Sequence, residues 1–158
     1  MKRSLKVGFS FGVTSGIITT LGLMVGLAFS TELKLAVIGG IITIAIADAF
    51  SDALGMHVSQ ESENRHPTKE IWESTLATFL TKFFVALSFV VPVLMLDLHT
   101  AVYIGIGWGL LLLSILSYNI ARKQKIPAWK AIGEHLVIAI AVIIIAAFVG
   151  NWVRTVFI

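Results

Sequence analysis

The sequence predicts an all-α, polytopic membrane protein with five transmembrane helices in each protomer. Of its 158 residues, 57% are hydrophobic and only 13% are charged, and the mean hydropathy is +0.92. A soluble domain has about a quarter of its residues charged, so we expect residues 1–158 to form a single transmembrane domain. The lack of cysteine excludes disulfides, thiolate metal sites and cysteine nucleophiles.

Five apolar segments approach or exceed the roughly 20 residues that a membrane-spanning helix needs. They cover residues 7–29, 35–58, 72–96, 100–121 and 130–153. Because the connections are short, consecutive helices should be antiparallel. Pro92 predicts a kink in the third segment, and glycines in the first and fourth predict close helix packing. The basic N-terminus also admits a cleaved signal peptide, although the apolar run is longer than is typical of one.

Lysine and arginine predict the orientation. Nine of them fall on one side of the predicted spans: Lys2, Arg3, Lys6, Arg65, Lys69, Arg122, Lys123, Lys125 and Lys130. The other side has only Lys34 and Arg154. The positive-inside rule therefore places the N-terminus in the cytosol, in the plasma membrane of a prokaryote or an organelle membrane of a eukaryote. The basic residues are explained by topology and do not indicate nucleic-acid binding.

Two acidic residues, Asp48 and Asp52, lie inside the second segment. A charge in hydrocarbon costs at least a few kcal/mol, so intramembrane acids usually line a pathway for ions or protons. The i, i+4 spacing places both carboxylates on one helix face, and Met56 continues that face. At 1.5 Å per residue, Asp52 lies about 9 Å and Asp48 about 15 Å inside the cytosolic boundary. Ser15 and Lys82 fall at roughly 12–15 Å, which predicts a polar vestibule open to the cytosol beneath an apolar outer layer.

These residue types predict a site for a transported divalent metal ion. Carboxylate oxygens from Asp48 and Asp52, a thioether from Met56 and a hydroxyl from Ser15 suit Fe²⁺ or Mn²⁺. Neighbouring carboxylates repel one another, so one of them can hold a proton in place of the metal. Glu134 and His135, about one turn into the fifth segment, are a candidate proton relay. The metal is cargo, and no permanently bound cofactor is expected.

Two stretches resemble the vacuolar iron transporter family, in its nodulin-like branch that lacks a cytosolic metal-binding domain. They are residues 15–23 with Gly26-Leu27, and residues 51–59 followed by Glu63. The resemblance implies a homodimer that exchanges ferrous iron or manganese for protons at the dimer interface, with Glu63 among the metal ligands. Ser15 stands where the family has an aspartate, Asp52 where it has a methionine, and Met56 where it has a glutamate.

Three alternatives remain open from the sequence. Lys82 could pair with Asp48 or Asp52, giving an ion pair that fixes helix register and binds nothing. The chain could be a non-transporting membrane scaffold derived from the same family. Paired aspartates also occur in metal-dependent membrane phosphotransferases, but the further acids and basic or glycine-rich motif of such enzymes are missing near Asp48. We therefore predict that the protein is not an enzyme.

Overall fold

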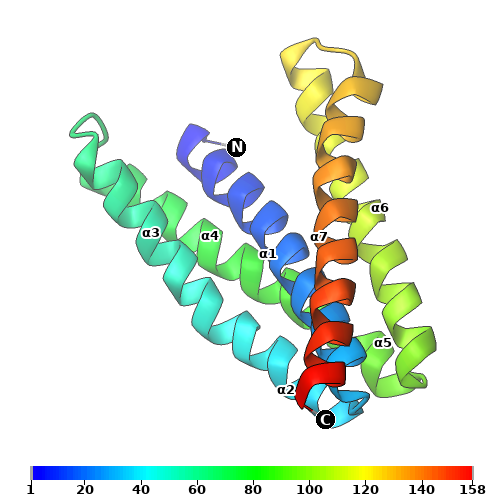
Figure 1. Cartoon of the computed structure of the whole chain (residues 1–158). Helices are drawn as coiled ribbons and strands as arrows, with labels where there is room; N and C mark the ends of the chain where they lie inside the picture. The colour runs from blue at the N-terminus through cyan, green and yellow to red at the C-terminus, as the bar shows by residue number, and fades with distance from the viewer. Residues whose placement is uncertain (1, 158) are drawn as a thin grey trace.

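The computed structural model describes residues 2–157 and is all-α (Figure 1). Its α-helices are α1 (Arg3–Thr31), α2 (Lys34–Thr43), α3 (Ala49–Ser62), α4 (Thr68–Ser88), α5 (Val90–Met95), α6 (Leu98–Gln124) and α7 (Ala128–Phe157). A π-helical segment, η1 (Ile44–Asp48), joins α2 to α3.

Five helical stretches are long and apolar enough to cross a membrane, which confirms the predicted number of spans. They are Arg3–Thr31, Lys34–Ser62, Thr68–Met95, Leu98–Gln124 and Ala128–Phe157. Each stretch begins before and ends after the predicted apolar segment, or coincides with it within a residue, because polar residues continue the helix beyond hydrocarbon. The chain thus has the helical content of a multi-pass membrane protein.

Helix α1 is the centre of the bundle. It contacts α4, α6 and α7, and its side chains Ile17, Leu21 and Met24 are fully buried. Figure 1 shows the α3–α4 and α6–α7 pairs on either side of the first half of α1. The two pairs converge near the C-terminus and diverge toward the N-terminal end of α1, so the bundle is widest at the end that carries most of the lysine and arginine.

Glycines hold α1 directly against α4. A Cβ added at Gly8 would lie 2.2 Å from the carbonyl oxygen of Ser74, and one at Gly12 would lie 2.7 Å from that of Thr78. These distances are below van der Waals contact, so a larger residue would push the two backbones apart. The packing role predicted for the first-span glycines is confirmed here. It is wrong for Gly107 in α6, where no described atom lies within 4 Å of an added Cβ.

The predicted kink at Pro92 is a break between α4 and α5. Proline has no N–H, and its ring clashes with the carbonyl four residues earlier, which here belongs to Ser88, the last residue of α4. The Phe89 N–H instead donates to the Ala86 carbonyl at 3.1 Å, and the helix resumes at Val90. The third span is therefore two helices meeting at a tight turn.

The second span is interrupted by the π-helical segment η1. Its residues contact α4 and α1, and Ala45, Ala49 and Ala53 form a buried stripe that continues from η1 into α3. Single π turns inside α-helices are uncommon and are frequent at functional sites. Asp48 is the last residue of this segment, so the wide turn ends at the first of the two intramembrane acids.

Candidate cation site

The most deeply buried charge in the described chain is the ammonium group of Lys82 on α4. The Lys82 side chain has 0% exposure. The glycine contact explains its position: added Cβ atoms at Gly12 and Gly16 would lie 3.2 and 3.3 Å from the Lys82 backbone nitrogen and oxygen. At these two glycines α1 has no side chain between its backbone and α4, and Ser15, next to Gly16, can reach the ammonium.

Three side chains from two other spans surround this ammonium, and we call the four residues Ser15, Asp48, Asp52 and Lys82 the Lys82 cluster. Nζ donates hydrogen bonds to Ser15 Oγ at 2.9 Å and to Asp52 Oδ2 at 2.5 Å. Asp48 Oδ2 forms an ion pair with Nζ at 2.5 Å. Ser15 Oγ in turn donates to Asp52 Oδ2 at 2.5 Å. The pairing of Lys82 that the sequence left open is thus observed, with both aspartates.

The cluster holds more negative than positive charge. Two carboxylates face one ammonium, a formal balance of −1 when all three groups are charged. Asp48 Oδ2 meets the ammonium at 2.5 Å without hydrogen-bond geometry, and this buried oxygen has no hydrogen-bond partner within residues 2–157. The ammonium is therefore its counter-ion, and displacing Lys82 would leave a buried acceptor without a partner, which is costly.

The carboxylates lie at the open edge of the cluster. The Asp48 side chain is 32% exposed and the Asp52 side chain 20%, against 0% for Lys82. On the helix they flank the buried alanine stripe, with Phe50 and Leu54 exposed on the adjacent face. An ion reaching the cluster would therefore meet the carboxylates before the ammonium.

The predicted metal ligands are only partly brought together. Ser15, Asp48 and Asp52 meet at Lys82, whereas Met56 is half-buried on α3 one turn further on. Glu63 lies beyond the end of α3 and pairs with His66 at 3.3 Å. Among the described residues no three His, Cys, Asp or Glu side chains converge into a group that could hold a metal. A metal at the cluster would therefore be bound by two carboxylates and a hydroxyl.

The predicted proton relay lies away from the cluster. Glu134 is exposed on α7. His135 Nδ1 is 2.7 Å from Ser117 Oγ on α6. Toward their shared end, α6 and α7 lie on the opposite side of α1 from α3 (Figure 1). The structure therefore connects His135 to a neighbouring helix and connects neither relay residue to Asp48 or Asp52.

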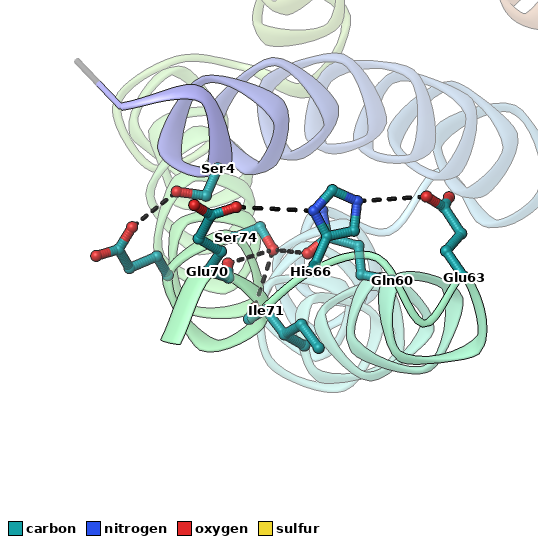
Figure 2. Close-up of polar contacts among 8 residues, drawn as sticks. Ser4, Gln60, Glu63, His66, Glu70, Ile71 and Ser74 are labelled. Atoms are coloured by element: carbon teal, nitrogen blue, oxygen red, sulfur yellow. Dashed lines mark hydrogen bonds and ion pairs between the residues drawn. The ribbon is translucent and has the colours of Figure 1, made fainter. Parts of the chain in front are cut away.

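A second polar network, which the sequence did not predict, joins the ends of α1, α3 and α4 (Figure 2). His66 lies between Glu63 and Glu70, with nitrogen–oxygen distances of 3.3 and 3.7 Å. Gln60 accepts a hydrogen bond from Ser74. These contacts hold the α3–α4 turn against α4, and the signal for them was only a cluster of polar residues around Pro67.

The N-terminal turn of α1 is tied to the same network. Ser4 Oγ, labelled in Figure 2, donates to Glu73 Oε2 at 2.7 Å. Lys2 Nζ pairs with Glu73 Oε1 at 2.6 Å. A small cavity of about 180 Å³ lies between these helix ends. Polar groups thus gather at this end of the bundle, and a vestibule that leads from it to the cluster stays a prediction.

The opposite end of the bundle carries an ion pair and a cavity. Glu32 and Arg154 form an ion pair there between α1 and α7. A cavity of about 530 Å³ lies beside that pair, lined by apolar residues of α1, α6 and α7 together with His99 and Asn151. Glu32 and Arg154 both lie outside the predicted spans 7–29 and 130–153, so the apolar outer layer stays a prediction.

Comparisons with protein-family models, with curated proteins and with solved structures found no match for this chain.

Proposed function

We propose that the protein is a membrane transporter that exchanges a divalent transition-metal ion, Fe²⁺ or Mn²⁺, for protons. The observation that carries the proposal is the Lys82 cluster, in which two carboxylates and a hydroxyl surround a positive charge near the middle of their helices. Such a group already binds one cation, the tethered ammonium. A free cation of suitable size and higher charge could compete for the same oxygens.

Electrostatics determines how that competition would proceed. Two unit charges 4 Å apart interact by about 4 kcal/mol at an effective dielectric constant of 20. A divalent ion bound by Asp48 and Asp52 would therefore repel the ammonium and displace it from between them. When the ion leaves, uncompensated carboxylates in a membrane are costly, and protons would neutralise them before the Lys82 side chain returns. This alternation couples metal movement in one direction to proton movement in the other.

The donor set is consistent with Mn²⁺ or Fe²⁺ as the cargo. Carboxylate and hydroxyl oxygens suit Mn²⁺, and a soft or imidazole ligand would favour Fe²⁺. Met56 lies one turn from Asp52 on α3 and could supply a thioether after a small rotation of its side chain. Glu63 and His66 lie at the end of the bundle and would act, if at all, before the ion reaches the cluster.

We propose further that the transporter is a homodimer, oriented with its N-terminus in the cytosol. The carboxylates of Asp48 and Asp52 are partly exposed at the edge of one protomer, and the neighbouring face of α3 is apolar and exposed at Phe50, Leu54 and Val58. A second copy packed on that face would enclose the cluster. The distribution of lysine and arginine supports the orientation.

The test is metal uptake into proteoliposomes that contain a pH-sensitive dye. Wild type should take up Mn²⁺ or Fe²⁺ with opposing proton movement, and Asp52→Asn should abolish both. Asp52→Asn preserves side-chain volume and leaves Lys82 paired with Asp48, so the fold should survive. Asp97→Asn, which neutralises an exposed acid outside the cluster, is the matched control and should transport normally.

A specific observation also favours a second candidate, a membrane scaffold that transports nothing. Lys82 is fully buried and contacts both aspartates, as expected of an ion pair that fixes helix register. On that account, wild type would show no flux in the same vesicles while remaining folded and oligomeric. Flux that survives Asp52→Asn would instead move the transport site elsewhere in the protein.

A further inference from the structure

A cleft lies between α1, α4 and α6, and none of the four residues of the Lys82 cluster lines it. Its volume is about 700 Å³. The walls are mostly apolar, with Phe9, Val13, Phe84 and Leu116 among the lining side chains. Several of these side chains are exposed in the protomer, including Phe9 and Phe84, so the cleft opens sideways along the bundle rather than being enclosed.

The mouth of the cleft is positively charged. The charged residues among its lining side chains are Lys6 from α1 and Lys123 from α6, and both are exposed. Asn119 and Gln124 add amide groups beside them. Neither lysine takes part in an ion pair within residues 2–157, so two cationic groups from different helices are available at one end of an apolar groove.

The dimensions of the cleft match one leaflet of a bilayer. From Lys123 to Leu112 the lining of α6 spans eleven residues, or roughly 17 Å at 1.5 Å per residue. One leaflet contributes half of the roughly 30 Å hydrocarbon core. A headgroup held at the lysines would therefore place an acyl chain along the whole apolar length of the groove.

We infer that this cleft binds one anionic phospholipid, with its phosphate between Lys6 and Lys123 and an acyl chain between α4 and α6. Two cationic groups at one end of an apolar groove match the charge and shape of an anionic lipid, whose phosphate would lie at the lysines and whose acyl chain would fill the groove. A metal ion would be repelled by the lysines. A soluble anion would leave the apolar groove unoccupied. The inference does not depend on the proposed transport function.

The test is native mass spectrometry of the detergent-purified full chain with added phosphatidylglycerol or phosphatidylcholine. Wild type should retain one phosphatidylglycerol in preference to phosphatidylcholine. A lysine near an anionic lipid headgroup contributes about a factor of five in affinity, so Lys6→Gln with Lys123→Gln should weaken phosphatidylglycerol binding roughly 25-fold. The matched control, Lys125→Gln with Lys130→Gln, removes two charges from the same end without touching the cleft and should bind as wild type does.

A second variant tests the groove independently of charge. Ile115 lines the cleft and is 50% exposed, so Ile115→Trp should fill the cleft without disturbing the core and should also reduce retention of phosphatidylglycerol. Equal binding of the two lipids, or an equal loss in the control pair, would overturn the inference. Displacement of the lipid by millimolar inorganic phosphate would also overturn it, because the site would then recognise a free anion.

Discussion

The α1–α3–α4 side of the bundle and the α6–α7 pair are built from membrane-spanning stretches of similar length, yet among the described residues buried charge is found only on the first side. On the first side a buried ammonium contacts two partly exposed carboxylates. Glycines bring the backbones of α1 and α4 into contact there. The α6–α7 pair is joined by apolar packing and by one contact between Ser117 and His135. Close backbone packing thus coincides with buried charge, which indicates that the geometry of the cluster depends on the glycine contact.

The largest expected effect is at Lys82. Lys82→Met keeps most of the side-chain volume but leaves two carboxylates without a counter-ion, and removing one partner of a buried pair typically costs about 3–5 kcal/mol. We expect a loss of that order in unfolding free energy, measured by denaturant titration in detergent. Added Mn²⁺ should restore part of it, because a ligand bound only to the folded state stabilises that state.

The control for this variant removes the carboxylates as well. Asp48→Asn and Asp52→Asn combined with Lys82→Met should recover most of the lost stability, since no uncompensated charge remains. A Lys82→Met protein as stable as wild type would show that the ammonium does not stabilise the α1–α3–α4 side. The proposed difference between that side and the α6–α7 pair would then be wrong.

The next largest effect is expected at the glycine contact. Gly8→Ala places a Cβ 2.2 Å from a backbone oxygen of α4, and overpacking of this kind costs about 1–3 kcal/mol. Gly107→Ala in α6 is the matched control, because an added Cβ there meets no described atom within 4 Å; we expect a change within about 0.5 kcal/mol. Thermal unfolding in detergent would measure both, and equal losses would contradict the difference in packing.

A smaller effect is expected in the α6–α7 pair. Ser117→Ala removes the hydroxyl that contacts His135, and interhelical hydrogen bonds in membranes average about 0.6 kcal/mol. Metal flux in the vesicle assay should remain within about two-fold of wild type, as it should for Glu134→Gln. A ten-fold loss of flux in either variant would instead return Glu134 and His135 to the proton pathway.

The smallest effect concerns Asp97, the N-terminal cap of α6, which lies between α5 and α6. Its carboxylate accepts a hydrogen bond from the Thr100 backbone N–H at 3.0 Å, which holds the pKa of Asp97 below its ordinary value of 3.8. The folded-state pKa is therefore depressed, so the stabilisation is present above the unfolded pKa and is lost as pH falls through the folded one. Asp97→Asn keeps a capping side chain and should remove this contribution to the pH dependence of stability. The measurement is the unfolding free energy of both proteins at about pH 6 and about pH 3.

Much of the fold could be predicted because its signals are local. Apolar length predicted the five spans, Pro92 predicted the break after Ser88, and the glycines of α1 predicted close packing. The depth count placed Ser15 and Lys82 near the level of Asp48, with Asp52 closer to the cytosolic boundary. These inferences use only residue type and position along a single helix.

The details of the site could not be predicted because they depend on contacts between helices. Ile44–Asp48 contains no glycine or proline that would have indicated the π turn. The sequence allowed Lys82 to pair with either aspartate and gave no reason for it to meet both. Glu63 was expected to be a ligand, but it lies beyond the end of α3, where it pairs with His66. His135 was expected near a proton path, but its partner Ser117 is set by the packing of α6 against α7.

The order of the charges along the chain has a consequence for biogenesis. A lysine at the centre of a helix raises the free energy of inserting that helix alone by about 2.5–3.5 kcal/mol. Asp52 emerges from the ribosome 30 residues before Lys82, on the helix that forms a hairpin with α4. The second and third spans should therefore enter the bilayer together as a hairpin in which Asp52 pairs with Lys82. The third span alone should insert poorly.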